Sequence, residues 1–349
     1  MKKQLTTLLR VCIFLFIGVG ILYLLYRGQN TKFVEDCALK GIPASECSLI
    51  RKIWQDFLSV NTFWLIMVLV AFMLSNLSRA HRWQMLFHGM GMRARFGTAF
   101  FTIMFGYLAN LGIPRIGEVL RAAMLARYEG IPIDKSIGTV VIDRMMDVLT
   151  FLMMMILAFI FEFNVIYGYL HAHLNLQTTA GKLIMPALIV FAGAVLALWF
   201  LRHRIRRWGL IRRFRTTILG FIDGLKSVKT LRNPWLFAGH TLFIWLMYFL
   251  MNYLCLKAFS PTASLGASAA LIVFVFGAMG ILFPSPGGMG TYHAMIIAAL
   301  VLYNISSDDA FSFANILYFS VQIFCNVVFG LIALIALPLI HRKPQQQTA

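Results

Sequence analysis

Long apolar runs separated by short polar or charged segments recur along the whole chain. An α-helix needs about 20 apolar residues to cross roughly 30 Å of hydrocarbon, and most of these runs approach that length. The pattern therefore predicts an all-α polytopic membrane protein. The apolar runs are Val11–Tyr26, Thr62–Ser78, Phe96–Ile113, Ile137–Phe161, Leu183–Leu201, Trp235–Leu256, Leu265–Pro284, Met295–Tyr303 and Phe311–Ile340.

The N-terminus has the basic flank and apolar run of a secretory signal. Lys2, Lys3 and Arg10 lie before Val11–Tyr26, and no small-x-small cleavage site follows that run. We therefore expect an uncleaved signal anchor that also serves as the first spanning helix.

Two apolar segments are broken by proline and glycine. Phe96–Ile113 runs into Pro114, and Leu265–Pro284 runs into the Pro286–Gly290 loop. A helix does not pass smoothly through such clusters, and a backbone break at membrane depth is tolerated only where protein or water surrounds it. The sequence therefore predicts two re-entrant hairpins, at residues 96–136 and 265–304, beside about six full transmembrane helices.

The composition excludes a soluble protein. Of the 349 residues, 60% are hydrophobic and 13% are charged, with a mean hydropathy of +0.79, so the charged residues are too few to cover a water-exposed surface. The net charge of +18 would suggest nucleic acid in a soluble chain, but here it indicates membrane topology and anionic lipid, and we expect no nucleic-acid partner.

Lysine and arginine gather in alternate loops, as the positive-inside rule requires. With both hairpins returning to the side that they entered, every base-rich loop is cytoplasmic and both termini lie inside. The base-rich segments are Lys2–Arg10, Arg79–Arg95, the basic cytoplasmic loop 202–233, and Arg342–Lys343.

The resulting topology has an internal symmetry within a single integral membrane domain, 1–349. Residues 8–161 give an outgoing helix, an incoming helix, a hairpin and an outgoing helix, and residues 183–340 repeat this order with every direction reversed. This is the arrangement of inverted-repeat transporters, in which paired broken helices point to the substrate site.

The first hairpin and the next span carry the densest candidate chemistry. A helix that begins after Pro114 directs free N–H groups toward an anion, and Arg115 and Arg121 would add phosphate contacts beside Glu118. Asp143, Arg144 and Asp147 follow in the next span, with both aspartates on one face. The alternative is that the aspartates favour a helix N-terminus while Arg121 and Arg144 snorkel to headgroups.

The second hairpin offers fewer polar groups near its break. Ser285, Thr291, Tyr292 and His293 are the candidates. A lone histidine in an apolar stretch is more often a hydrogen-bonded structural residue than a proton carrier, although its ordinary pKa suits either role.

These residues resemble two signatures of the lysylphosphatidylglycerol synthase transmembrane-region family, also called flippase-like. Asn110-x-x-x-Pro114-x-x-Gly117-Glu118-x-x-Arg121, followed by Gly130 and Asp143-Arg144-x-x-Asp147, resembles the first signature, and Pro286-Gly287-Gly288-Met289-Gly290 resembles the second. The resemblance implies a multi-pass protein of the bacterial inner membrane, related to the lipid-translocating part of aminoacyltransferases. The resemblance implies substrate-binding roles for Asn110, Pro114, Gly117, Glu118, Arg121, Arg144, Asp147 and the Pro286–Gly290 loop.

Two departures limit what the resemblance implies. His293 stands where family members commonly have Glu, so a mechanism that needs a carboxylate on both hairpins is in doubt. Asp143 stands where they often have Glu. The chain ends nine residues after the last span. We therefore expect no soluble aminoacyl-transferring domain and no inherited synthase activity.

The remaining motifs bear on partners and redox state. Cys37 and Cys47 share an outward loop, where an oxidising compartment would permit a disulfide. The stretch 202–215 fits an interfacial helix on anionic headgroups or an ordinary positive-inside anchor, and His171 and His173 fit a solvated loop better than a metal site. No nucleotide-binding or metal-ligand motif is present, so we expect no cofactor and no metal.

Two functional classes remain, together with a third alternative. The first is a transporter that moves or binds an anionic or zwitterionic lipid, or a polyprenyl-linked lipid, by rocking two halves around a midplane site. The second is a membrane enzyme that transfers a group onto a lipid phosphate, with Asp143, Asp147 or Glu118 as base. A non-catalytic lipid-binding subunit is the third, and a homo-oligomer or a partner enzyme stays open.

Overall fold

The computed structural model describes residues 2–39, 41, 43, 47–165, 231–283 and 285–341, and these residues form helices and no strand. The predicted span Leu183–Leu201, the loop positions 202–230, His171 and His173 lie outside the described residues. The elements are α1 (Lys2–Leu39), α2 (Leu49–Ser59), α3 (Thr62–Gly89), α4 (Phe96–Gly112), α5 (Ile116–Glu129), α6 (Ile133–Phe161), α11 (Pro234–Ala258), η1 (Ser260–Thr262), α12 (Ala267–Leu282), η2 (Pro286–Gly288), α13 (Thr291–Val301), α14 (Ser307–Leu317), the π-helical η3 (Tyr318–Cys325) and α15 (Asn326–Ile340).

Four helical stretches within the described residues are long and apolar enough to cross a membrane. They are α3, α6, α11 and the continuous stretch Ser307–Ile340 formed by α14, η3 and α15. Three shorter apolar helices accompany them, namely α4, α12 and α13. The protein is therefore an all-α, multi-pass membrane protein, and the short helices coincide with the segments that the sequence predicts to be broken.

The N-terminal helix is longer than its apolar run. α1 continues past Tyr26 to Leu39, and α2 follows within the segment that sequence analysis treats as an outward loop. The Ser48 hydroxyl caps α2 by accepting a hydrogen bond from the Arg51 backbone N–H. The segment between the first two spans therefore contains a helix that the hydropathy pattern did not predict.

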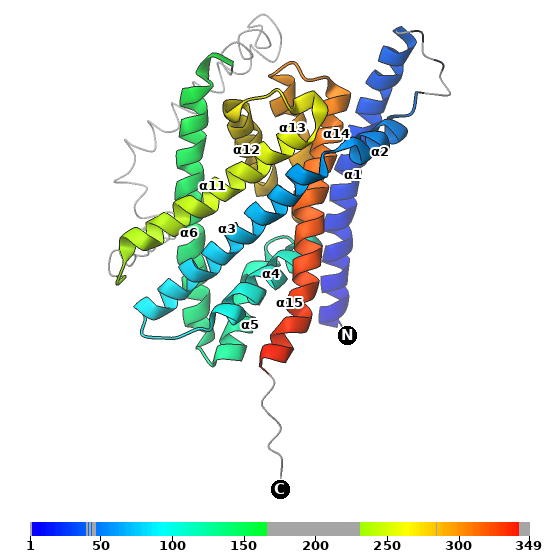
Figure 1. Cartoon of the computed structure of the whole chain (residues 1–349). Helices are drawn as coiled ribbons and strands as arrows, with labels where there is room; N and C mark the ends of the chain where they lie inside the picture. The colour runs from blue at the N-terminus through cyan, green and yellow to red at the C-terminus, as the bar shows by residue number, and fades with distance from the viewer. Residues whose placement is uncertain are drawn as a thin grey trace, which may run out of the picture.

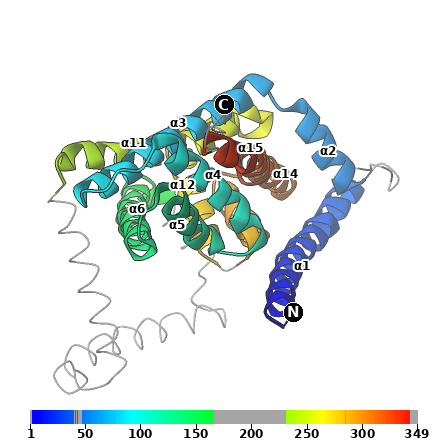
Figure 2. The ribbon, with the colours of Figure 1, turned by 90° about the horizontal axis from the view of Figure 1, so that it is seen from below.

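The long helices run between two ends of the molecule, and the short helices fill the space between them. α1, α6 and the α14–α15 stretch extend along the full height, whereas α3 and α11 cross it obliquely side by side (Figure 1). α1 begins at the end where α15 finishes. Seen along this axis, α1 stands at the rim of the bundle and α2 links it to α3 (Figure 2).

The two sequence halves interlock. α3 of the first half packs most extensively on α11 of the second, and α4 of the first half packs on α15 of the second. His81 of α3 stacks on His240 of α11, with ring centroids 5.9 Å apart, while Phe72 of α3 stacks on Phe329 of α15. The core is therefore shared between the halves.

α4 and α5 form a tightly closed helical hairpin. Gly117 faces the backbone of Gly106, where an added Cβ on Gly117 would lie 1.9 Å from the Gly106 carbonyl oxygen. The Asn110 side-chain oxygen accepts a hydrogen bond of 2.7 Å from the Gly117 N–H, which satisfies one free donor of the first turn of α5. Only a glycine pair permits this approach.

The second hairpin, α12 and α13, is closed in the same way. An added Cβ on Gly280 would lie 2.7 Å from the Tyr292 Cα. The Thr291 hydroxyl donates a hydrogen bond of 2.8 Å to the Gly280 carbonyl. Gly287 and Gly290 in the connecting loop have φ values of 57° and 83°, which favour glycine.

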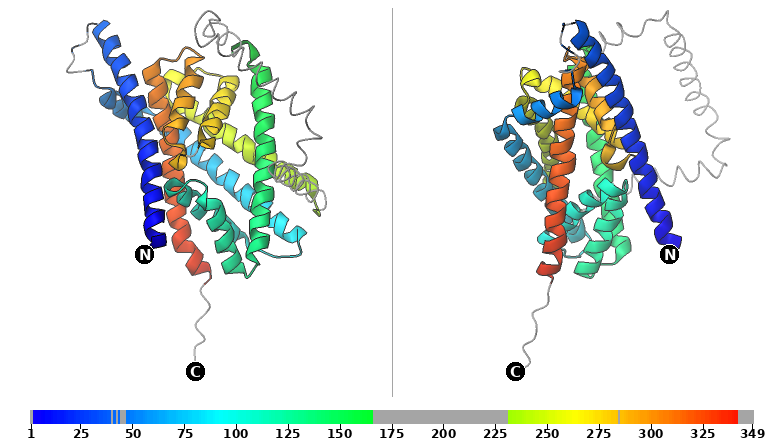
Figure 3. Two further views of the ribbon diagram at one scale, coloured as in Figure 1. Left: turned by 180° about the vertical axis from the view of Figure 1, so that it is seen from behind. Right: turned by 90° about the vertical axis from the view of Figure 1, so that its right-hand side faces the viewer.

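The two hairpins lie in opposite halves of the molecule and touch at their tips. The α4–α5 hairpin occupies one half of the molecule and the α12–α13 hairpin the other (Figure 3). Arg115, at the first tip, donates a hydrogen bond of 3.2 Å to the Leu282 carbonyl, and the Leu111 side chain lies against Gly287. Arg115 adopts a left-handed conformation with φ 64°, so the turn before α5 is sharp.

Candidate functional site

Two aspartates on one face of α6 form the centre of a buried polar cluster. Asp143 is fully buried, and Asp147, one turn later, is 8% exposed. Asp143 is the eleventh residue of the 29-residue helix, about 15 Å along its axis from the start. A carboxylate at this depth requires cationic partners.

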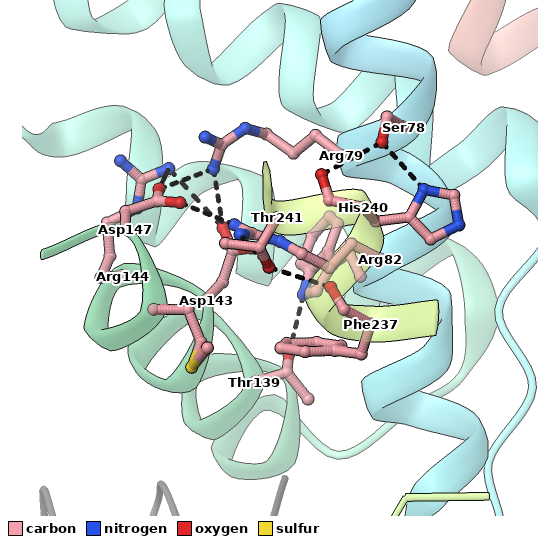
Figure 4. A network of polar contacts seen from close by, with 12 residues as sticks. Ser78, Arg79, Arg82, Thr139, Asp143, Arg144, Asp147, Phe237, His240 and Thr241 are labelled. Carbon is pink, nitrogen blue, oxygen red and sulfur yellow. Dashed lines mark hydrogen bonds and ion pairs between the residues drawn. The ribbon is translucent and has the colours of Figure 1, made fainter. Parts of the chain in front are cut away.

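Two arginines of α3 supply those partners. Arg79 donates hydrogen bonds of 3.0 Å to Asp143 and 2.9 Å to Asp147, and Arg82 binds the same two carboxylates, with 2.8 Å to Asp147 (Figure 4). Arg79 and Arg82 are 1% and 0% exposed. Because each arginine binds both carboxylates, these ion pairs hold α3 against α6.

A third arginine reaches the cluster from the first hairpin. Arg121 of α5 donates a hydrogen bond of 2.9 Å to Asp143, and its guanidinium lies 5.0 Å from the centroid of the Trp83 ring. The Trp83 indole N–H in turn donates a 2.9 Å hydrogen bond to Thr139 of α6. The hairpin, α3 and α6 therefore share one network.

The second half of the chain completes the surroundings of the cluster. On α11, the Thr241 hydroxyl accepts a hydrogen bond of 3.1 Å from Arg82, and the Tyr248 hydroxyl accepts one of 3.1 Å from Arg79. Tyr107 of α4 lies 3.4 Å from Tyr248, oxygen to oxygen. The site is thus built from both sequence halves.

Arg144 is held much more loosely than the other arginines. It lies 3.4 Å from Asp147, 3.6 Å from Asp143 and 3.7 Å from Glu118 of α5, and 39% of its side chain is exposed. The Glu118 side chain is 27% exposed. Arg144 and Glu118 therefore form the open edge of an otherwise buried cluster.

Comparison with known protein families gives a match over most of the chain. The sequence profile described as the lysylphosphatidylglycerol synthase TM region matches residues 48–330. The chain belongs to this family. The resemblance inferred from the two signatures is thereby confirmed, and every residue of both signatures lies inside the matched region of the family profile.

One curated relative has a related sequence. A UPF0104 membrane protein of Methanocaldococcus jannaschii is 22% identical over 286 residues, which cover 75% of this chain and 81% of the relative. No solved structure matches the chain. The family assignment therefore rests on sequence, and the site geometry rests on the contacts described above.

The candidate site residues on the two hairpins and α6, other than His293, fall into two groups in space. Glu118, Arg121, Asp143, Arg144 and Asp147 meet in the cluster. A second group, made of Asn110, Pro114, Arg115 and Gly117 with the loop Pro286, Gly287, Gly288 and Gly290, forms the two touching hairpin tips.

His293 lies apart from both groups. It is 1% exposed, and its ring centroid lies 4.7 Å from that of Tyr318. Its Nδ1 atom has no hydrogen-bond partner among the described residues. None of its contacts described here reaches the arginines, so His293 belongs to a separate polar patch beside the π-helical stretch of the last span.

Sequence reasoning missed Arg79 and Arg82 as site residues. It treats them as a cytoplasmic flank after a span that ends at Ser78, but α3 continues to Gly89 and both arginines are buried. Their spacing of three residues was a usable signal, because it places both on one helix face, as it does for Arg144 and Asp147.

The predicted cysteine pair is bonded in the structure. Cys37, near the end of α1, and Cys47, just before α2, form a disulfide with Cα atoms 6.3 Å apart. The bridge fixes the turn between α1 and α2, at the end of the molecule away from the start of α1 (Figure 3). Both cysteines lie outside the region that matches the family profile.

Proposed function

We propose that this protein binds an anionic or zwitterionic lipid, or a polyprenyl-linked lipid, and moves it between the leaflets of a bacterial inner membrane. The observation that carries the proposal is the cluster of four arginines around two aspartates, buried between the membrane-spanning helices α3 and α6 and the short helix α5. The arginines are Arg79, Arg82, Arg121 and Arg144. Charged groups at this depth are costly and are kept where a polar headgroup must pass.

The touching hairpins support a path through the bilayer. If both hairpins are re-entrant, the tips at Arg115 and Gly287 lie near the midplane, as in inverted-repeat transporters. The headgroup of a lipid that moves past these tips would need protein polar groups in place of the water that it leaves. The matched family, named for a lipid synthase, and the inferred inverted repeat are consistent with this role.

Transport also agrees better with the state of the carboxylates than group transfer does. Asp143 and Asp147 each accept hydrogen bonds from two or more arginines, which stabilises the ionised form and leaves neither free to act as a base. We therefore propose that the aspartates act through their negative charge on the arginines and not as bases.

Reconstitution tests the proposed transport directly. In liposomes that contain a fluorescent phosphatidylglycerol, the full chain should make inner-leaflet lipid accessible to a membrane-impermeant quencher. Arg121→Ala and Asp147→Ala should slow this by about tenfold or more, because each removes a buried charge of the cluster. Arg93→Ala is the matched control, since Arg93 is exposed after α3. Wild-type rates equal to those of protein-free liposomes would refute transport.

Labelling from each side tests the inferred topology. With both termini cytoplasmic, Gly288→Cys in the second hairpin should react with an impermeant thiol reagent from the outer side. The native cysteines are first replaced by serine. Labelling of Gly288→Cys from the cytoplasm alone would contradict the outward-opening hairpin.

A further inference from the structure

We propose that Arg144 binds the phosphate of the lipid headgroup as a phosphodiester, and that Glu118 is the internal anion that this phosphate displaces. The proposal deepens the proposed lipid transport and rests on it for the identity of the ligand as a lipid.

The cluster carries more positive charge than its own carboxylates neutralise. Four arginines, Arg79, Arg82, Arg121 and Arg144, meet only Asp143, Asp147 and Glu118 in the ion pairs found among the described residues. One positive charge is therefore left over. An uncompensated charge in a medium of low dielectric is costly, so an external anion is favoured there.

The arginines also retain free N–H donors. Buried nitrogens without a hydrogen-bond acceptor among the described residues are Nε of Arg79, Arg82 and Arg144, and both Nε and Nη1 of Arg121. Guanidinium groups bind phosphate oxygens through paired donors, and a phosphate offers several acceptors at once. Among these arginines only Arg144 has a partly exposed side chain, so the free donors of the other three are not open to a phosphate from outside.

Arg144 is the member of the cluster that a ligand can reach. Its side chain is 39% exposed, whereas those of Arg79, Arg82 and Arg121 are at most 3% exposed. Its three ion pairs, at 3.4 to 3.7 Å, are longer than the 2.8 to 3.0 Å bonds of the buried arginines to the aspartates. Arg144 can therefore exchange a weak partner for a stronger one without breaking the core of the cluster.

Glu118 is the weak partner that gives way. It lies 3.7 Å from Arg144 and is itself partly exposed. Glu118 stays beside the cluster after it leaves Arg144, so the net excess of one positive charge still matches a phosphodiester, which carries one negative charge. Replacing Glu118 by glutamine adds a second excess charge, which would match a phosphomonoester that carries close to two.

Binding to the full chain in detergent, measured by calorimetry, tests this assignment. The probes are dihexanoyl phosphatidylglycerol, dihexanoyl phosphatidic acid, dihexanoylglycerol and inorganic phosphate. Wild type should bind phosphatidylglycerol, and should bind dihexanoylglycerol and inorganic phosphate at least about tenfold more weakly. Equal affinity for dihexanoylglycerol would exclude phosphate recognition, and equal affinity for inorganic phosphate would exclude a lipid as the source of the phosphate.

The variants separate recognition from folding. Arg144→Gln should weaken phosphatidylglycerol binding by about tenfold or more, and Arg144→Lys should restore part of it. Glu118→Gln should tighten binding of both phospholipids and favour phosphatidic acid, an outcome that a misfolded variant cannot give. Arg93→Gln, the exposed control, should bind like wild type.

The outcomes also distinguish this proposal from the transport proposal. Unchanged binding in Arg144→Gln, or no gain in Glu118→Gln, would overturn the assignment of the phosphate site even if lipid transport is observed. Normal phosphate-dependent binding without any transport would refute lipid movement and leave the phosphate site standing.

Discussion

Arg79 Nη1 lies 2.9 Å from Asp147 Oδ2, and this ion pair joins α3 to α6 across 68 residues of sequence. Because the cluster has an excess of positive charge, the two sides of this pair are not equivalent. Asp147→Asn adds to the excess, whereas Arg79→Met removes it and fills the space with an apolar chain.

The asymmetry gives a stability prediction. Asp147→Asn should lower the free energy of unfolding by about 3–5 kcal/mol, and Arg79→Met should lower it by clearly less. Denaturation of both variants in the same detergent measures the difference. Equal losses, or a larger loss in Arg79→Met, would contradict an excess of positive charge at the site.

The hairpin contact at Gly117 gives a second prediction. Gly117→Ala would place a methyl group against the Gly106 carbonyl, where backbone and not a flexible side chain must move. We expect a loss of stability of about 1–3 kcal/mol, together with loss of transport. Thermal unfolding measures the stability change. The matched control is Gly138→Ala on α6, where an added Cβ meets nothing within 4 Å and should be neutral or slightly stabilising.

Lys52 gives a third prediction, on the attachment of α2. Its ammonium group lies 2.6 Å from Asp309 of α14 and 2.8 Å from Asp56. Lys52→Met should loosen α2 and raise hydrogen exchange across residues 49–59, while stability elsewhere changes little. Arg51→Met, at an exposed neighbouring position, is the control. Unchanged exchange in Lys52→Met would show that apolar packing alone holds α2.

The same group sets the pH range of that attachment. Burial lowers the pKa of Lys52, but its hydrogen bonds to Asp309 and Asp56 outweigh burial and raise it above the usual 10.5. A raised folded-state pKa means that the stabilisation is fully present below the unfolded pKa and is lost as the pH rises through the folded value. The contribution of this lysine to the protection factors of the α2 amides should therefore be constant from neutral pH to about pH 10. The protection factors should fall only at higher pH.

The disulfide gives a prediction about compartment. Cys37 and Cys47 should resist alkylation in denaturant until a reductant is added, whereas the buried thiols Cys255 and Cys325 should react once the chain is denatured. Peptide mass spectrometry distinguishes the two classes. Free Cys37 and Cys47 in protein isolated under non-reducing conditions would contradict exposure of the α1–α2 turn to an oxidising compartment.

Proline and glycine made the broken segments predictable. The sequence breaks at Pro114 and at Pro286–Gly290 coincide with the turns between α4 and α5 and between α12 and α13. These residues act locally, through a missing donor or a positive φ, so their effect is visible without knowing the fold. Asp143, Arg144 and Asp147 could be found for a related reason, because charges inside an apolar run are conspicuous.

The partners of those charges could not be found in this way. Arg79 and Arg82 look like an ordinary basic flank until Asp143 and Asp147, more than 60 residues later, are placed beside them. The length of α3 was misjudged for the same reason, since a hydropathy window cannot tell a neutralised arginine from a solvated one. The π-helical stretch Tyr318–Cys325 left no composition signal within its apolar run.

The extensive contact between α3 and α11 limits the movements that the proposed transport can use. If the whole first half moved against the second, the contact between α3 and α11 would break. Arg79 and Arg82 would then lose their hydroxyl acceptors on α11. If the protein moves lipid as proposed, α3 and α11 would stay together while the two short hairpins rearrange. That rearrangement would have to include the Arg121–Asp143 ion pair and the packing of α4 on α15. Alternating exposure would then be a local gating movement rather than the rocking of two rigid lobes.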